Sequence, residues 1–355
     1  MRIGFLQDLT VPSHVDLVSP SFLAFDLAVH DAIEAGGSEL DVEVVQMDTE
    51  GDPERAVSFA REIVADPSYV AAVAAPFWSE PPEVAAILED AGVPTLSLSP
   101  QSPSSATGTQ AASGLWRRFV PDASLQVEVL ADVITSAATS EVKDGAAEPV
   151  CILGEDWSYS TELQSDLDEA LAPSITRTML TLDDDVDVDL AHGRGCGLVV
   201  WTGAPDGAVD LASALHAAGS VRGRPVDFGA DALKTVIPPT APNHEGVVVG
   251  ALTCPCADVS TRSDDGVRRF INAYQSANGL APGIYAAEAW DAAQVLAGAL
   301  AGEAHDRTAV AASLARLERF DGVVGEYVFD GGGELVSPRV GLYSAAGSRW
   351  LPVDR

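Results

Sequence analysis

Short apolar runs and longer amphipathic segments alternate along the first hundred residues of the chain. The apolar runs predict strands at 2–6, 40–47, 70–75 and 94–98 because short runs bounded by turn residues are typical of buried strands. The segments between them predict helices. The first follows a loop up to Pro20 and ends at Gly36-Gly37, the second begins at Asp52-Pro53, and the third lies at 81–91. This β-α-β-α-β-α-β order is typical of a parallel sheet with helices on both faces.

The same alternation continues through the rest of the chain. The expected helices lie at 125–136, 161–171, 206–218, 264–278, 284–301 and 308–316, and the expected strands at 150–153, 175–181, 197–201, 226–229, 246–252, 327–329 and 340–343. The final third has too few strands for a doubly wound sheet of its own, so it is expected to complete the first two lobes. With 355 residues the chain is long for one core and sufficient for two. The predicted fold class is therefore α/β, with two doubly wound parallel-sheet lobes.

Composition and charge exclude several classes of protein. A hydrophobic content of 47% with six Trp and ten Phe excludes a disordered chain. No apolar run reaches the roughly 18 residues that a membrane-spanning helix needs. The formal net charge of −33 argues against nucleic-acid binding, because binding to phosphates requires basic surfaces. We interpret the acidity itself as a means of solubility or salt adaptation.

The cysteines and one acidic stretch give no metal-binding pattern. Cys254-Pro255-Cys256 has one residue between its thiols, whereas redox and zinc motifs have two. The stretch 183–189 is rich in Asp but lacks the glycine and the terminal glutamate of an EF-hand loop. We interpret it as a solvated loop or helix start, with calcium binding as the alternative. No metal and no cofactor are expected.

The other two cysteines lie beside predicted strands. Cys151 begins the strand at 150–153, and Cys196 directly precedes the strand at 197–201. In a doubly wound sheet of order 2-1-3-4-5 these strands are neighbours. The two thiols are then expected within the roughly 4.4–6.8 Å Cα range of a disulfide. An exported protein would form this bridge, whereas a reducing compartment would leave four free thiols.

A series of short motifs occurs in one order along nearly the whole chain. They are Arg2-Ile3-Gly4-Phe5, Ala35-Gly36-Gly37, Ala75-Pro76-Phe77-Trp78-Ser79, Ala91-Gly92-Val93-Pro94, Arg118-Phe119-Val120-Pro121-Asp122, Pro282 and Tyr285 with Trp290-Asp291-Ala292, and Phe320-Asp321-Gly322 with Gly325, Phe329 and Asp330. With these motifs the chain resembles the type I periplasmic binding proteins, in particular the leucine/isoleucine/valine- and amide-binding branch. Trp290 stands where that family usually has Tyr.

The resemblance implies two lobes joined by three crossings, near 119–121, 249–253 and 325–328. Lobe 1 would comprise residues 1–119 and 250–326, and lobe 2 residues 120–249 and 327–355. A small ligand would bind between the lobes, which would close on it by hinge motion.

The resemblance also implies ligand contacts in lobe 1. Ser79 matches the serine of the family's small-Pro-x-x-Ser turn, which holds the ligand carboxylate or an equivalent oxygen; the alternative is a plain helix N-cap. Ser99 and Gln101 stand where the family has a small residue and Thr, so this sequence keeps polar groups there but departs from the family's pattern. The alternative is that this stretch is a simple loop. Phe77 and Trp78 would border the cleft.

In lobe 2 the implied contacts are aromatic residues and one acid. Tyr159 falls on the family's aromatic position, with Trp157 two residues earlier; the alternative is a surface or core-edge aromatic. Asp231 falls where amino-acid binders keep the acid that pairs with the ligand's ammonium, although it also suits a helix N-cap. A further family aromatic is missing after Trp201-Thr202-Gly203, and Trp201 could replace it. Such an aromatic cleft suits a larger or flatter ligand, or a quaternary amine.

The predicted function is a ligand-binding receptor for an amino acid, amide or related amine, most simply the substrate-binding component of an ABC transporter with a membrane permease as partner. The alternative is the ligand-sensing domain of a regulator or receptor. An enzyme is disfavoured because the sequence has no nucleophile-elbow or dinucleotide-binding motif. The chain begins directly in a predicted strand, without a signal peptide. The expected location is extracellular or periplasmic, with a membrane anchor in the full-length form, if a signal was removed. The alternative is a cytoplasmic location.

Overall fold

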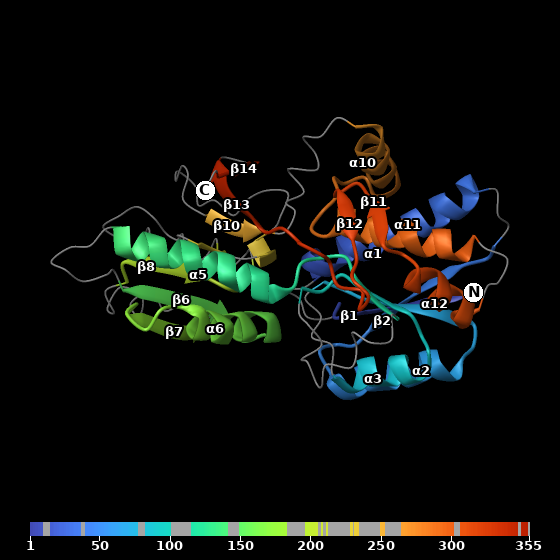
Figure 1. Cartoon of the computed structure of the whole chain (residues 1–355), viewed down its shortest axis with the longest axis horizontal. Helices are drawn as coiled ribbons and strands as arrows, with labels where there is room; N and C mark the ends of the chain where they lie inside the picture. Colours follow the sequence, from blue (N-terminus) through green and yellow to red (C-terminus); the bar gives the residue numbers. More distant parts are fainter. Residues whose placement is uncertain are drawn as a thin grey trace. The chain divides into compact units, whose positions relative to one another are not determined.

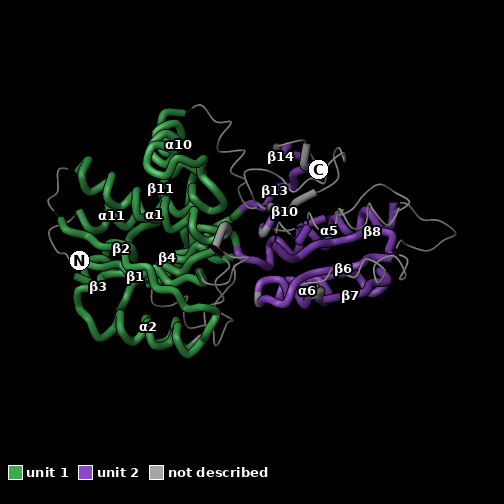
Figure 2. Tube along the Cα trace, turned by 180° about the vertical axis from the view of Figure 1, so that it is seen from behind, with its two compact units in different colours: residues 1–121, 259–338 green, residues 122–258, 339–355 purple. Residues whose placement is uncertain are grey.

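The computed structural model describes residues 1–9, 15–36, 40–76, 82–100, 115–140, 149–182, 196–204, 207–208, 211, 228–229, 231–233, 249–252, 264–301, 306–346 and 349–353. The chain divides into two compact units (Figure 2). Unit 1 comprises Met1–Pro121 and Val259–Pro338, and unit 2 comprises Asp122–Asp258 and Arg339–Arg355. The chain therefore passes between the units three times. The sequence placed these boundaries after residues 119, 249 and 326, whereas the structure divides the chain after 121, 258 and 338.

Unit 1 is built on a five-stranded parallel sheet of order β2-β1-β3-β4-β5. The strands are β1 (Arg2–Gln7), β2 (Glu43–Asp48), β3 (Tyr69–Ala74), β4 (Thr95–Ser97) and β5 (Trp116–Arg118). Every residue of β3 is buried, as expected for a strand covered on both faces. The first four strands were predicted. β5 was not, because Trp-Arg-Arg carries no apolar pattern, yet all three of its residues are buried.

Helices cover both faces of the unit 1 sheet (Figure 1). They are α1 (Val15–Ala35), α2 (Pro53–Ala65), α3 (Pro82–Asp90), α10 (Asp265–Asn278), α11 (Ala286–Leu300) and α12 (Arg307–Ala315). Asp52, Asp264 and Asp306 cap α2, α10 and α12 by accepting hydrogen bonds from backbone N–H groups of the first turn. The predicted loop up to Pro20 was wrong. The first helix, α1, already begins at Val15 and contains Pro20.

The segment after α12 belongs to unit 1 by its packing. β11 (Arg319–Asp321) and β12 (Glu326–Val328) form an antiparallel pair. The ring of Tyr327, in β12, lies 5.2 Å from that of Phe119. This packing explains why the third boundary lies after residue 338 and not at 326.

Unit 2 is built on a seven-stranded sheet of order β14-β13-β10-β9-β8-β6-β7. Its strands are β6 (Val150–Glu155), β7 (Arg177–Leu182), β8 (Leu198–Trp201), β9 (Phe228–Gly229), β10 (Val249–Leu252), β13 (Gly341–Ala346) and β14 (Arg349–Pro352). The part from β7 to β10 is parallel and has the 2-1-3-4-5 order that the sequence predicted. β13 and β14 add antiparallel strands from the end of the chain.

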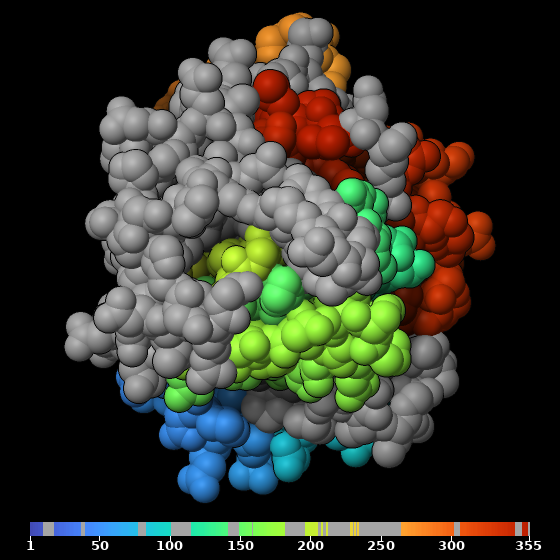
Figure 3. All heavy atoms as spheres, turned by 90° about the vertical axis from the view of Figure 1, so that its left-hand side faces the viewer, coloured from blue at the N-terminus to red at the C-terminus, as the bar shows by residue number. Residues whose placement is uncertain are grey.

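Two helices of unit 2 are α5 (Ala123–Ser140) and α6 (Ser158–Ala170), which pack against each other. The yellow-green atoms of the α6–β7 part of the sequence lie at the surface of unit 2 (Figure 3). Among the helices that the structure describes in either unit, none is long and apolar enough to cross a membrane.

The core of unit 2 contains a disulfide between Cys151 and Cys196, whose Cα atoms are 5.6 Å apart. β6 and β8 are adjacent, with Cys151 opposite Val199, so the predicted juxtaposition of the two thiols is confirmed. The buried hydrophobic cluster that contains Cys151 also includes Leu153, Val199, Trp201, Ala208, Leu211, Leu233 and Trp350. Cys254, Cys256 and the acidic stretch 183–189 lie outside the described residues.

Candidate functional site

The carboxyl ends of β6, β8 and β9 lie side by side at one edge of the unit 2 sheet. Leu153 pairs with Trp201, and Trp201 pairs with Gly229, so the residues that follow these positions leave the sheet at the same edge. Neighbouring strands are about 4.8 Å apart, so the ends of β6 and β9 are separated by roughly 10 Å. This edge brings Trp157, Tyr159 and Asp231 to the same end of the sheet, on segments that follow β6 and β9. Ligands of open α/β sheets bind at such edges.

Trp157 and Tyr159 form an aromatic pair at the start of α6. Their ring centroids are 5.2 Å apart, with the planes tilted by 41°. The Tyr159 hydroxyl donates a hydrogen bond of 3.1 Å to Oε1 of Gln126, a buried residue of α5. Tyr159 is itself buried, whereas Trp157 is partly exposed. The hydrogen bond fixes the ring of Tyr159, and the ring of Trp157 packs beside it.

Asp231 begins a short 3-10 helix, Asp231–Leu233, directly after β9. Its exposed fraction is 0%. The preceding Gly229 allows this turn to close tightly, because an added Cβ would lie 2.1 Å from Cδ1 of Leu233. Burial thus keeps the Asp231 carboxyl group away from water at the end of the sheet that β9 reaches.

Trp201 lies in the core and not at the surface of this edge. It is 1% exposed and packs in the cluster around the disulfide. Its Nε1 donates a hydrogen bond of 2.8 Å to the carbonyl oxygen of Ala204. An added Cβ at Gly203 would lie 2.6 Å from Cζ2 of the indole. The Trp201 side chain therefore packs against the loop after β8 and holds it through the hydrogen bond to Ala204.

A polar network that the sequence did not indicate joins the ends of β6 and β8. The backbone N–H of Glu155 donates to Oγ of Ser160 at 3.0 Å, and this hydroxyl shares a 2.9 Å hydrogen bond with Oγ1 of Thr202. The Glu155 carboxylate accepts a 2.7 Å hydrogen bond from the N–H of Ala204. The one signal in the sequence is Gly154, where an added Cβ would lie 2.3 Å from both hydroxyl oxygens. The network holds the start of α6 against the loop after β8.

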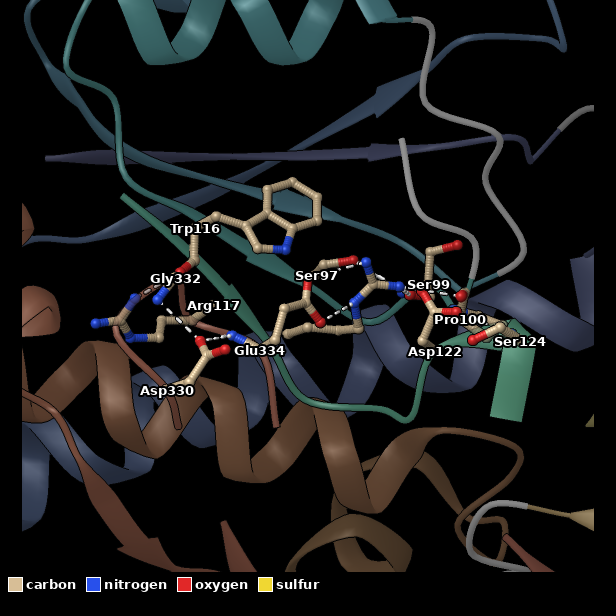
Figure 4. A network of polar contacts seen from close by, with 11 residues as sticks. Ser97, Ser99, Pro100, Trp116, Arg117, Asp122, Ser124, Asp330, Gly332 and Glu334 are labelled. Carbon is tan, nitrogen blue, oxygen red and sulfur yellow. Dashed lines mark hydrogen bonds and ion pairs between the residues drawn. The ribbon is translucent and has the colours of Figure 1, made fainter. Parts of the chain in front are cut away.

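In unit 1 the described part of the predicted site is the end of β4. Ser99 is buried, and its N–H donates to Oγ of Ser97 at 3.2 Å. Its carbonyl oxygen and that of Pro100 accept hydrogen bonds from Nη1 of Arg118, at 3.4 and 3.0 Å, in the polar network of Figure 4. The other predicted residues of this site lie outside the described residues: Phe77, Trp78, Ser79 and Gln101.

Arg118 is a residue that the sequence indicated only as part of a crossing motif. It is 1% exposed and forms an ion pair with Glu334, with Nε and Oε2 2.9 Å apart. No local pattern could show this, because the two residues are 216 positions apart.

Gln7 is a second polar residue that the sequence did not indicate. It ends β1, the strand between β2 and β3 at which the strand order reverses, and its exposed fraction is 0%. Its backbone carbonyl accepts a hydrogen bond from the N–H of Thr49. Within the described part of the chain, neither atom of its side-chain amide has a hydrogen-bond partner. Its only signal in the sequence is a polar residue at the end of an apolar run.

Comparisons with known proteins bear on both units. The sequence profile of the family described as "Periplasmic binding protein" matches residues 1–339, which is most of the chain. A comparison with curated protein sequences found no match.

Solved structures with the same fold cover nearly the whole chain. The branched-chain amino acid transporter substrate-binding protein LivJ from Streptococcus pneumoniae, in complex with isoleucine, has a TM-score of 0.73 at 17% identity, with 99% of each chain covered. An ABC transporter substrate-binding protein from Desulfitobacterium hafniense, in complex with Leu, has a TM-score of 0.70 at 20% identity, again with 99% of each chain covered. A solute-binding protein from R. palustris, in complex with benzoate, has a TM-score of 0.72 at 15% identity, with coverage of 99% of this chain and 95% of that one. At these identities the likeness establishes the fold and not the ligand.

Proposed function

The chain belongs to the periplasmic binding protein family, and from this premise we propose that it is the substrate-binding component of an ABC transporter for a small polar ligand. The family consists of non-catalytic binding proteins, which confirms that the chain is not an enzyme. The proposed ligand class is an amino acid, an amide or a related amine. The proposed partner is a membrane permease.

The observation that carries the proposal is the edge of the unit 2 sheet where Trp157 and Tyr159 follow β6 and Asp231 follows β9, the two strands on either side of β8. An aromatic pair and a buried carboxyl group at the same edge suit a ligand that joins an apolar body to an ammonium group. Ser79 in unit 1, proposed from the family motif, would hold the carboxylate or carbonyl oxygen of the same ligand. The three solved complexes described above hold leucine, isoleucine and benzoate, each of which joins a carboxylate to an apolar body.

The disulfide in unit 2 supports an extracytoplasmic location. Disulfides persist in oxidising compartments and are rare in the cytosol. The Cys151–Cys196 bridge closes a segment with a sequence separation of 45, inside the core of the unit. We therefore propose that the protein works outside the cytoplasm, as its family does typically.

A thermal-shift screen tests the proposed function. The purified chain is screened against amino acids, amides, polyamines, betaines and aromatic carboxylates, and each hit is confirmed by calorimetric titration. A ligand that binds only the folded state adds about 2.7 kcal/mol of stability at 100 times its Kd. Small-angle scattering with the best ligand then tests hinge closure, which would give a more compact particle. A broad screen without any stabilising compound, together with unchanged scattering, would contradict the receptor function.

A further inference from the structure

We infer that Arg118 is a positioning residue of the ligand site in unit 1, because its guanidinium holds the Ser99–Pro100 segment at the end of β4 in place. The inference rests on the proposed function, since Ser99 is a ligand contact only if the chain is a receptor. Arg118 would then affect the affinity for the ligand as well as the stability of the fold.

Arg118 is in direct contact with the Ser99–Pro100 segment. β4 and β5 pair so that Ser97 lies opposite Arg118, and the chain after Ser97 leaves the sheet beside the guanidinium. Nη1 of Arg118 donates to the carbonyl oxygens of Ser99 and Pro100. Carbonyl groups beyond the end of a strand have no partner in the sheet, so their donors must come from elsewhere. A planar guanidinium supplies several donors in a fixed geometry.

The guanidinium of Arg118 is also bound by a carboxylate. Glu334 binds it through two contacts, with Nε–Oε2 and Nη2–Oε1 distances of 2.9 and 3.1 Å. Such a two-point pair fixes orientation as well as charge. The side chain of Arg118 is 2% exposed and that of Glu334 is 40% exposed. Glu334 is therefore the group that keeps a buried cation oriented while itself remaining near water.

Glu334 lies in the turn 330–334, which is held by hydrogen bonds within the turn and by contacts with β5. Oδ1 of Asp330 accepts hydrogen bonds from the N–H groups of Gly332 and Glu334, at 2.8 and 3.0 Å. Gly333 has a φ of +90°, and an added Cβ there would lie 1.8 Å from the carbonyl oxygen of Trp116. The backbone N–H of Arg118 also donates to the carbonyl oxygen of Gly333. The turn 330–334 thus lies directly against β5 and leaves Glu334 little freedom.

Arg118 and Glu334 both precede points where the chain leaves unit 1. The boundaries of unit 1 lie at Pro121 and Pro338. The ion pair therefore joins the Ser99–Pro100 segment to two of the three crossing segments. A ligand that contacts this segment acts on a part of unit 1 that is tied to both crossings.

Arg117 provides a matched control. It is as buried as its neighbour, at 1% exposed, but successive side chains of a strand point to opposite faces. Its Nη1 donates to the carbonyl oxygen of Trp116, and its guanidinium lies 5.8 Å from the ring of Phe329. Figure 4 shows this side chain near Asp330 and Gly332, away from Ser99 and Pro100. Replacing each arginine by Lys therefore compares two buried arginines, of which only Arg118 contacts the Ser99–Pro100 segment.

The experiment compares Arg118→Lys, Glu334→Gln and the control Arg117→Lys. Two quantities are measured for each: the Kd for the best ligand from the screen, and backbone hydrogen exchange of the segment around Ser99 without ligand. We expect Arg118→Lys and Glu334→Gln to raise the Kd by about tenfold and to speed exchange of that segment. Arg117→Lys is expected to lower the ligand-free Tm to a similar extent as Arg118→Lys while leaving the Kd within about twofold.

Two outcomes would overturn the inference. One is a Kd that stays unchanged in both Arg118→Lys and Glu334→Gln. The other is a rise in Kd that is proportional to the loss in Tm in both Arg118→Lys and Arg117→Lys. Arg118 would then have a structural role only. Glu334→Gln keeps the test valid if Arg118→Lys does not fold, because Glu334 lies partly in water. If wild type binds nothing, the proposed function and the inference fail together. If wild type binds ligand but exchange and Kd do not respond to the variants, the inference fails alone.

Discussion

The guanidinium of Arg307 donates a hydrogen bond of 2.6 Å to the backbone carbonyl oxygen of Tyr69, 238 positions earlier in the chain. The same group donates to the carbonyl oxygens of Ile63, Val64 and Asp66. These carbonyls belong to the end of α2 and the turn that follows it, where the last turn of a helix leaves acceptors without intrahelical donors. One side chain of α12 thus closes the end of α2 and the start of β3.

Replacing Arg307 by Gln should lower the free energy of unfolding by about 1–3 kcal/mol, because buried acceptors lose charged donors. Arg268→Gln is the matched control. Its ion pair with Asp265 lies on the surface, so the expected loss is below about 0.5 kcal/mol. Chemical denaturation of both variants gives the comparison. Equal losses would show that Arg307 acts as an ordinary surface arginine.

Asp291 of α11 gives the fold a pH dependence. Its carboxylate accepts hydrogen bonds from the N–H groups of Val323 and Val324 and from the hydroxyl of Tyr327. Burial outweighs these bonds and raises the pKa of Asp291 from 3.8 to about 7, with the nearby carboxyl of Glu288 adding to the rise.

Between these two pKa values the folded state holds a proton that the unfolded state has released. The contribution of Asp291 to the free energy of unfolding therefore falls as the pH rises from about 4 to about 7, by on the order of a few kcal/mol, and is constant above that window. Denaturation of wild type and of Asp291→Asn at pH 5, 6, 7 and 8 measures the effect. The difference in free energy of unfolding between wild type and Asp291→Asn should change with pH across this range. A difference that stays constant with pH would contradict the prediction.

The disulfide predicts a large effect of reduction. Cys151 and Cys196 are separated by 45 positions, and cross-linking a loop of this length stabilises the folded state by about 4 kcal/mol in the chain-entropy description. The double variant Cys151→Ser, Cys196→Ser should lose most of this amount and become insensitive to reductant. Cys254→Ser with Cys256→Ser is the control, and its Tm should still fall on reduction. Peptide mapping of unreduced protein that shows free thiols at 151 and 196 would refute the bridge.

Asp231→Asn tests the proposed contact with a ligand amine. The variant keeps the shape of the side chain and removes the charge, so a cationic ligand should bind more weakly by about 2–5 kcal/mol. Asp132→Asn, on an exposed position of α5 in the same unit, should leave the Kd unchanged. Calorimetric titration with the best ligand of the screen measures both. If Asp231→Asn binds as tightly as wild type, the ligand is neutral there and is held instead by Trp157 and Tyr159.

Gln7→Met should increase stability. The side-chain amide of Gln7 is buried and has no hydrogen-bond partner among the described residues, so an apolar side chain of similar length removes a cost of about 1–2 kcal/mol. Gln164→Met is the control, and it should lower stability. The amide of Gln164 donates to the carbonyl oxygen of Leu180 and accepts from the hydroxyl of Thr181, and both bonds would be lost. A loss of stability in Gln7→Met would show that its amide is satisfied in solution.

Much of the fold follows from the sequence because periodicity is a local property. The apolar runs located the first four strands of unit 1, and the glycines and Asp-Pro located helix ends close to their observed positions. The strand order placed Cys151 beside Cys196, because a doubly wound sheet leaves few possible neighbours. The same pattern gave the α/β class, the two-lobed organisation and, through the order of the motifs, the family.

The tertiary structure decided what depends on partners far away in the chain. Trp116–Arg118 became a strand only through pairing with β4, since its own residues lack any strand pattern. Trp201, expected to border the ligand, packs in the core because the strand that carries it lies beside the disulfide. The buried guanidinium of Arg118 and the buried carboxyl group of Asp291 are tolerated because Glu334, Val323 and Tyr327 supply their contacts. Burial of a polar group depends on long-range partners, and no local pattern in the sequence records them.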